Sequence, residues 1–108
     1  MNNDTTNKVV LYMRCARIGE GDPIAEQREV LRQEAANHGL EVGGEYVDAG
    51  CSGLSPATCP QLRRLLADAK AGLLAYVIVR DLSRLSRGPD LWAIVEELRR
   101  FGVILHCI

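Results

Sequence analysis

The alternation of strand-type and helix-type segments most constrains the fold of this chain. Short apolar runs at residues 8–15, 41–47, 75–79 and 103–108 are predicted as strands, and the first is nearly continuous, as in strands covered on both faces. Helix-type segments separate these runs, so the order is strand and helix, repeated three times, and then a strand. That order predicts one α/β domain, in which helices flank a mostly parallel sheet of four or more strands, with right-handed crossovers.

The helix-type segments carry apolar residues at helical spacing. Asp22 followed by Pro23 predicts an N-cap and a first helical position, and Thr58 or Cys59 is the predicted cap of the second helix. The third helix is predicted from about residue 89 to residue 100. The inward stripes are predicted as Ile24, Gln27, Leu31 and Ala35, then Leu62, Leu65, Leu66 and Ala69, then Leu91, Val95 and Leu98, and Trp92 is interpreted as core or interface packing.

Three arginines follow the third predicted strand within eight residues. Arg80, Arg84 and Arg87 occupy a loop that Leu82 and Leu85, alternating with the arginines, anchor to the core. Ligands of open α/β sheets bind at the carboxyl ends of the strands, where this loop lies. Guanidinium groups stay charged and offer a planar fork of donors that suits phosphate oxygens. The loop is therefore interpreted as a phosphate-binding site, and the alternative is a solvated charged loop.

Polar residues also mark the ends of the first two predicted strands. Arg14 ends the first strand, and Asp48 begins a loop, residues 48–58, that is rich in Gly, Ser and Pro. Gln27 is the polar member of the first helix's inward stripe, which makes it either a boundary position or a side chain aimed back at the first strand. Because parallel strands end at one edge of the sheet, we expect the three strand ends to converge on one crevice.

Composition and spacing exclude several classes of protein. The net charge of −1 over 108 residues excludes a domain that binds polyanions over its whole surface. No apolar run approaches the ~20 residues of a membrane helix, residues 1–7 are predicted as a disordered polar tail, and a cytoplasmic protein is expected. We expect no metal site, because His38 and His106 complete no zinc spacing. The four cysteines form no C-x-x-C pair and are predicted as free thiols: Cys15, Cys51, Cys59 and Cys107.

Four short motifs follow one another along the chain. Residues 12–16 read YMRCA, residues 24–31 read IAEQREVL, residues 46–53 read YVDAGCSG, and residues 82–87 read LSRLSR. In that order they resemble the Y-x-R-x-S opening, the Q-x-x-x-L helix, the Asp…S-G loop and the L-D-R-L-x-R motif of the serine recombinases, the resolvase/invertase family. Because the matches come at family-like spacing, residues 8–108 are identified as a member of this family, with a resolvase-like, flavodoxin-like three-layer fold.

The resemblance implies site-specific cutting and rejoining of DNA through a serine that becomes linked to the 5′ phosphate. No cofactor is then needed, because the covalent intermediate stores the energy of the broken bond. By position, the resemblance implies phosphate binding by Arg14, Arg84 and Arg87, orientation of the site by Gln27 and Asp48, and contacts to nucleic acid from Arg80, Ser52 and Tyr12.

The resemblance also implies parts that residues 1–108 do not include. In the family, a long helix after this domain builds dimers and tetramers, and a separate module reads the DNA sequence. We therefore expect a fragment of a longer protein of bacterial or mobile-element origin, which binds DNA weakly through a few phosphate contacts.

Three positions depart from the family pattern. The nucleophile position is Ala16, the position before Pro60 is Cys59 where the family often has Arg, and the aspartate of the loop motif is Ser83. Cys15 is a poor substitute nucleophile, because a shift of one residue along a strand turns the side chain to the other face. The chain is therefore predicted to be inactive in cleavage, with Ala16 either an engineered substitution or a sign of natural degeneration.

Two further functions stay open at this point. One is a non-catalytic regulatory or assembly module of the same fold, which partners active recombinase subunits. The other is a flavodoxin-like binder of a small phosphate ligand, which gives no reason for Tyr12, Arg14, Gln27 and Asp48 to occur together.

Overall fold

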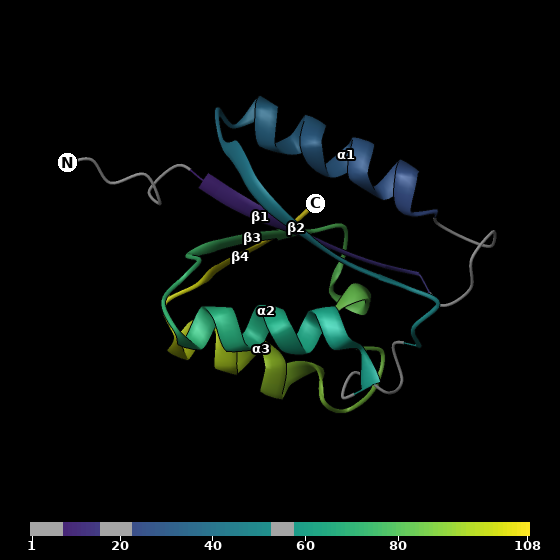
Figure 1. Ribbon diagram of the computed structural model, residues 1–108, viewed down its shortest axis with the longest axis vertical. Helices are drawn as coiled ribbons and strands as arrows, with labels where there is room; N and C mark the ends of the chain where they lie inside the picture. The colour runs from purple at the N-terminus through teal and green to yellow at the C-terminus, as the bar shows by residue number, and fades with distance from the viewer. Residues whose placement is uncertain (1–7, 16–22, 53–57) are drawn as a thin grey trace.

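The computed structural model describes residues 8–15, 23–52 and 58–108, and these residues form three layers (Figure 1). The predicted tail at residues 1–7 and the predicted N-cap Asp22 lie outside the described residues. The elements, in chain order, are β1 (Lys8–Cys15), α1 (Ile24–Asn37), β2 (Glu41–Ala49), α2 (Pro60–Lys70), β3 (Tyr76–Val79), the 3₁₀ helix η3 (Leu82–Arg84), α3 (Leu91–Arg100) and β4 (Ile104–Cys107).

The four described strands form one parallel sheet in the order β2-β1-β3-β4. Figure 1 shows α1 on one face of this sheet and α2 with α3 on the other. The predicted fold class is thereby confirmed. Residues 9–13 of β1 and the whole of β3 are largely apolar, as expected where a helix layer covers each face of the sheet.

The core divides into two clusters, one on each face of the sheet. Side chains of β1 alternate between the faces, so Leu11 packs with Leu31 of α1, and Tyr12 packs with the helices of the other face. On α1, the predicted inward stripe is confirmed: Gln27, Leu31 and Ala35 are buried, and Ile24 is partly buried against the core. None of the described helices combines the length and the apolar character that crossing a membrane requires.

The third helix confirms its predicted inward residues but adds one that was not predicted. Leu98 is buried and Leu91 and Val95 are partly buried against the core, while the buried Ile94 was missed. The side chain of Trp92 is 67% exposed, so its interpretation as core packing is wrong. Helical spacing alone does not decide whether Ile94 faces inward with the predicted residues. The packing of α3 beside α2 buries the face that carries Ile94.

The cysteines also differ from the prediction, because two of them form a disulfide. Cys51 follows β2 and Cys59 precedes α2, and their Cα atoms lie 5.8 Å apart in a disulfide-bonded pair. Cys15 and Cys107 are free thiols, as predicted, the first buried and the second exposed. The pairing follows from the tertiary contact between the end of β2 and the start of α2, which spacing alone does not reveal.

Candidate functional site

On the β3 side of β1, a side chain rather than a strand provides the hydrogen bonds at the end of the strand. β3 pairs with β1 at Val10 and Leu11, whereas β2 runs beside β1 as far as Cys15. At Arg14, the side-chain amide of Gln27 takes the place of the missing strand. Its Nε2 donates to the Arg14 carbonyl at 3.0 Å, and the Arg14 N–H donates to its Oε1 at 3.3 Å. Gln27 is thus aimed at the end of the first strand, which favours the second of the two interpretations of this residue.

The guanidinium of Arg14 fastens three segments together. The residue is 1% exposed, and its Nε donates to the carbonyl of Arg84 at 3.0 Å. Its Nη2 donates to the carbonyl of Ser83 at 2.6 Å, and its Nη1 donates to the carbonyl of Cys51 at 3.0 Å. The ends of β1 and β2 and the loop that follows β3 therefore meet at this side chain, as expected for parallel strands, while a crevice between them stays a prediction. The contact of Arg14 with a phosphate stays a prediction, since the contacts seen here are to backbone carbonyls.

The segment after β3, residues 80–88, is called the arginine loop below, and its own polar groups hold its shape. The Asp81 carboxylate caps η3, because it accepts a hydrogen bond from the Ser83 N–H at 3.0 Å and another from the Ser83 hydroxyl. Ser86 is buried, and its Oγ accepts from the Gly88 N–H at 3.0 Å. Leu85 is fully buried in the core. The loop is therefore a fixed platform for its arginines.

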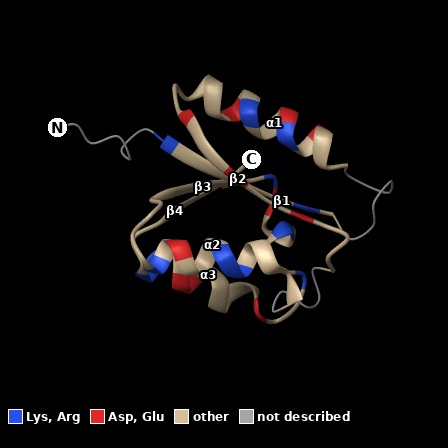
Figure 2. Ribbon diagram, viewed as in Figure 1, with Lys and Arg blue, Asp and Glu red and all other residues tan. Residues whose placement is uncertain are grey.

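The arginines of this loop lie against the end of β1. Nη1 of Arg84 donates to the Arg14 carbonyl at 3.4 Å, while its Nε lies 3.8 Å from the Asp81 carboxylate. Burial lowers the pKa of the Arg14 guanidinium, and the nearby positive charges of Arg84 and Arg87 lower this pKa further. Arg87 is exposed and Arg80 is partly exposed. Figure 2 shows the basic segments of β1 and of the arginine loop side by side. The result is a concentration of positive charge at the carboxyl edge of the sheet.

Asp48 is engaged with the framework of the site. Its carboxylate accepts from the backbone N–H groups of Gln61 at 3.0 Å and Leu62 at 2.9 Å, in the first turn of α2. The Tyr12 hydroxyl donates to Asp48 Oδ2 at 2.8 Å. Burial raises the pKa of Tyr12 far above its ordinary value, and the hydrogen bond to Asp48 raises it further. The pair joins β1, β2 and the positive end of the α2 dipole, and so fixes the position of α2 relative to the strand ends.

Two predicted site residues lie at the margin of the described structure. Ser52 is exposed and directly follows Cys51, whose carbonyl accepts from Arg14. Ala16, the predicted nucleophile position, lies outside the described residues.

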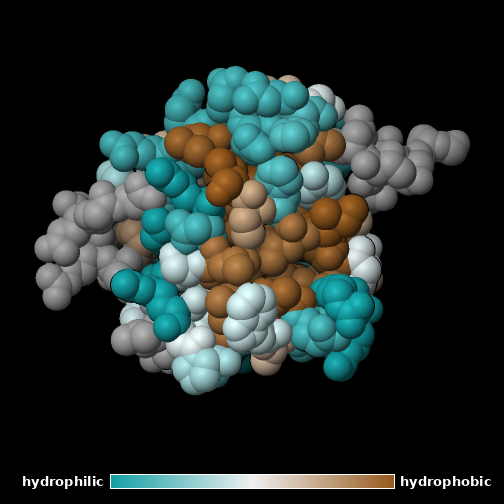
Figure 3. All heavy atoms as spheres, turned by 180° about the vertical axis from the view of Figure 1, so that it is seen from behind, coloured by the Kyte–Doolittle hydropathy of each residue, from teal (hydrophilic) through white to brown (hydrophobic). Residues whose placement is uncertain are grey.

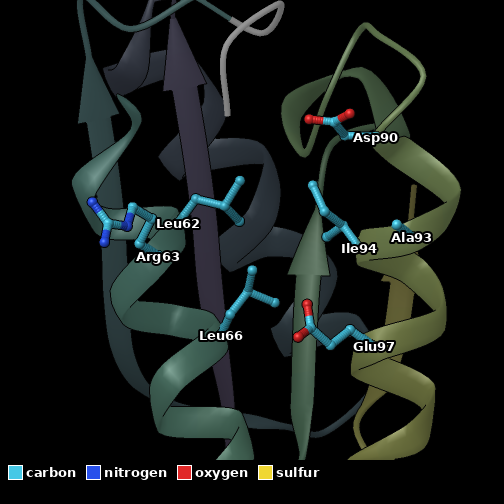
Figure 4. Close-up of a pocket in the computed structure, with 7 residues that line it drawn as sticks. All are labelled: Leu62, Arg63, Leu66, Asp90, Ala93, Ile94 and Glu97. Atoms are coloured by element: carbon cyan, nitrogen blue, oxygen red, sulfur yellow. The ribbon is translucent and has the colours of Figure 1, made fainter. Parts of the chain in front are cut away.

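A separate apolar groove of about 260 Å³ lies between α2 and α3 (Figure 4). Leu62 and Leu66 of α2 face Ile94 of α3 across it, and the carboxylates of Asp90 and Glu97 lie along its rim. None of the predicted site residues lines this groove. Arg63 also lines the groove, but no arginine of the arginine loop does, so the groove is separate from the basic site.

Two features of the structure were missed by sequence reasoning. Asp81 shapes the arginine loop, and the Asp-x-Ser sequence that it begins is a local turn signal that could have indicated this role. Glu34, His38 and His106 form a cluster that the local sequence does not signal, because His106 lies 72 residues from Glu34 along the chain.

The chain is similar to a family of known proteins. The family model described as "Resolvase, N terminal domain" matches residues 9–108. The N-terminal catalytic domain of TP901-1 integrase is 31% identical, with a TM-score of 0.85, over 91% of this chain and 75% of that chain. A resolvase family site-specific recombinase from Streptococcus pneumoniae is 30% identical, with a TM-score of 0.78, over 94% of this chain and 71% of that chain.

The fold also extends to more distant structures. A serine recombinase from Sulfolobus solfataricus has a TM-score of 0.80 at 22% identity, over 95% of this chain and 69% of that chain. This chain spans 65% of the length of another Sulfolobus solfataricus protein, the first ORF in transposon ISC1904. No match is found among curated protein sequences.

Proposed function

Because the chain belongs to the serine recombinase family, as a resolvase N-terminal domain, we propose that it binds the sugar-phosphate backbone of DNA at the carboxyl edge of its sheet. The observation that carries this proposal is the attachment of the arginine loop to the end of β1 by the Arg14 guanidinium. That attachment holds Arg84 and Arg87 close enough for their charges to act on Arg14.

Electrostatics supports a phosphate as the ligand. The positive charges of Arg84 and Arg87 repel that of Arg14 and lower its pKa. The negative charge of Asp81 acts on Arg14 in the opposite direction and raises this pKa. A phosphodiester that bridges Arg84 and Arg87 offsets this repulsion, and guanidinium forks match its oxygens. Asp48 does not compete for these arginines, because two backbone N–H groups and the Tyr12 hydroxyl surround its carboxylate.

We further propose that the chain binds DNA without cutting it. In the family reaction, a serine Oγ forms a bond to phosphorus while the bond from phosphorus to the 3′ oxygen breaks, and the leaving oxygen takes a proton. The methyl group of Ala16 has no oxygen to form the first bond. The chain would then serve as a binding or assembly module among recombinase subunits, and by the same resemblance the longer protein would work as a dimer or tetramer.

The binding test compares two matched pairs of arginines. Fluorescence anisotropy of a labelled duplex measures affinity for the parent chain, for Arg84→Gln/Arg87→Gln, and for the control Arg28→Gln/Arg32→Gln. The control removes the same charge from α1, where both arginines pair with Glu45 at 3.0 Å and 2.6 Å. With two or three phosphate contacts, the affinity of the parent falls roughly 10- to 40-fold between about 50 and 200 mM salt.

The two pairs are expected to differ in the salt dependence of binding. Loss of the loop arginines lowers the slope of log affinity against log salt by about 1.8, because two phosphate contacts disappear. The control pair keeps the parent's slope. Equal losses in both pairs would contradict the proposal, and so would tight binding of a nucleotide or flavin by a chain that does not bind DNA.

The cleavage test uses a nicked DNA substrate that traps covalent intermediates. The parent chain is expected to form no protein–DNA adduct on a denaturing gel. Ala16→Ser restores the attacking oxygen, but Cys59 and Ser83 still depart from the family pattern, so this variant alone is not expected to reach full activity. An adduct of the parent at Cys15 or at any serine would overturn the proposed loss of cleavage.

A further inference from the structure

Three side chains that are far apart in the sequence meet between α1 and β4. Glu34 lies in the last turn of α1, His38 is the residue that caps the C-terminal end of this helix, and His106 lies on β4, at the edge of the described sheet. Glu34 Oε2 is 3.0 Å from His38 Nε2 and 2.7 Å from His106 Nε2. The two imidazole rings meet edge to face, with centroids 5.2 Å apart. A single carboxylate oxygen therefore contacts two imidazole nitrogens that come from different parts of the fold.

We propose that Glu34, His38 and His106 form a binding site for Zn²⁺ or a similar divalent transition-metal ion. One ligand atom from each of the three side chains lies within 4.8 Å of the other two. Around a tetrahedral zinc ion with ligand bonds of about 2.0–2.1 Å, neighbouring ligand atoms are about 3.3 Å apart. The separations of 3.0 Å and 2.7 Å between Glu34 Oε2 and the two imidazole nitrogens are close to that spacing.

The donor set selects the class of ion. Two imidazoles and one carboxylate suit zinc, copper, nickel and related metals, whereas magnesium and calcium prefer oxygen ligands throughout. Both histidines direct Nε2 toward Glu34, so both can coordinate through the same type of nitrogen.

Burial gives the site one open side. The side chains of Glu34 and His106 are 21% and 25% exposed, while His38 is 49% exposed. Three protein ligands leave the fourth position of a tetrahedral ion to a water molecule, which can enter from the side of His38. The ring of Tyr76 lies 6.3 Å from that of His106.

A bound ion would join α1 to β4. Both elements already pack on β3, but they come from opposite ends of the chain. An ion that binds only the folded chain stabilises it by mass action, so the melting temperature rises with metal concentration. This linkage gives a readout that does not depend on DNA.

The experiment titrates ZnCl₂ into the 108-residue chain by calorimetry and follows the melting temperature. One equivalent is expected to bind and to raise the melting temperature. His38→Gln, His106→Gln and Glu34→Gln are each expected to weaken binding roughly tenfold or more, since each removes a ligand. Glu96→Gln is the matched control for Glu34, because Glu96 is an exposed helical glutamate paired with Arg99 at 2.6 Å.

The free thiols provide the competing explanation for any zinc bound. Cys107→Ser is therefore measured in parallel, and it is expected to keep the parent's affinity. The exposed position of His38 makes its variant the least disruptive to folding, so it decides the case if His106→Gln does not fold. Binding that is unchanged in His38→Gln, or lost in Cys107→Ser, or absent from the parent at millimolar zinc, would overturn the proposal.

Discussion

Replacing Gln27 with leucine removes the side-chain amide that completes the hydrogen bonding of β1 at Arg14. Gln27 is fully buried, and its two bonds to the Arg14 backbone have lengths of 3.0 Å and 3.3 Å. Leucine has a similar size but neither donates nor accepts. The substitution therefore tests the polar contribution of this position with little change in packing volume.

The expected loss follows from the two backbone groups that the amide serves. The Arg14 N–H is left without its acceptor in a buried place, which costs about 1–3 kcal/mol. The Arg14 carbonyl keeps the 3.4 Å contact from Arg84 and loses only the shorter bond from Gln27. A lost bond of that kind is worth about 1 kcal/mol. The free energy of unfolding should therefore fall by about 2–4 kcal/mol, which lowers the melting temperature by roughly 8–16 °C in a domain of this size.

Urea denaturation followed by circular dichroism measures this change, with Gln33→Leu as the matched control. Gln33 lies on the exposed side of the same helix, where its amide donates only to Asn37 at 3.0 Å. The control should stay within about 0.5 kcal/mol of the parent, as surface substitutions do. If Gln27→Leu also stays within that range, the amide does not hold the end of β1 and the reasoning is refuted.

Three further outcomes test other parts of the framework. Cys51→Ser/Cys59→Ser opens the ring that the disulfide closes over a sequence separation of 8 and should lower the free energy of unfolding by about 2.5 kcal/mol in the chain-entropy model, whereas an unchanged urea midpoint would show that the pair contributes nothing. Asp48→Asn removes an acceptor from the first turn of α2 and should cost about 2–3 kcal/mol, against about 1 kcal/mol for Tyr12→Phe, and the opposite ranking would contradict the capping role of Asp48. Burial, and then the hydrogen bond to Asp68, raise the pKa of Tyr46 to about 12, so the stability gained from the neutral phenol is present below the ordinary pKa of 10.0 and is lost as the pH rises through about 12. Asp68→Asn should lower that pKa in a tyrosinate absorbance titration, and an unchanged midpoint would exclude the hydrogen bond as a cause.

Local sequence patterns were sufficient to predict the layers of the fold and part of the candidate site. The near-continuous apolar run of β1 indicated a strand covered on both faces, and the helical spacing of α1 placed Gln27 inward. The alternation of strands and helices along the chain predicted a parallel sheet. Because parallel strands end at one edge of the sheet, the meeting of Arg14 with the arginine loop was expected. These features depend on short-range periodicity and on topology, which a sequence states directly.

Features that depend on tertiary contacts could not be predicted from local sequence patterns. The disulfide between Cys51 and Cys59 requires the end of β2 to meet the start of α2, and the contact of His38 with His106 requires the C-terminal end of α1 to lie near β4. On α3, helical periodicity allows more than one stripe, and only packing selects Ile94. The sequence predicted Arg14 as a site residue, but it did not reveal that the guanidinium donates to backbone carbonyls.

The surface outside the candidate site is uneven in polarity. Figure 3 shows apolar side chains gathered across the middle of the face opposite to that of Figure 1, below the polar surface of α1. Large hydrophobic residues that are more than half exposed are Leu73, Trp92, Ile104 and Ile108. Two of these belong to β4 and the residue that follows it, so the β4 edge of the described sheet is both unpaired and apolar.

The most direct test of the phosphate site observes the arginine side chains themselves. The Nε–Hε signals of ¹⁵N-labelled chain are recorded while a short DNA duplex is added at low salt. Saturable shifts are predicted for Arg84 and Arg87, while Arg28 and Arg32, which are paired with Glu45, stay in place. Equal shifts at all four arginines, or shifts confined to Arg28 and Arg32, would contradict a phosphate site at the end of β1.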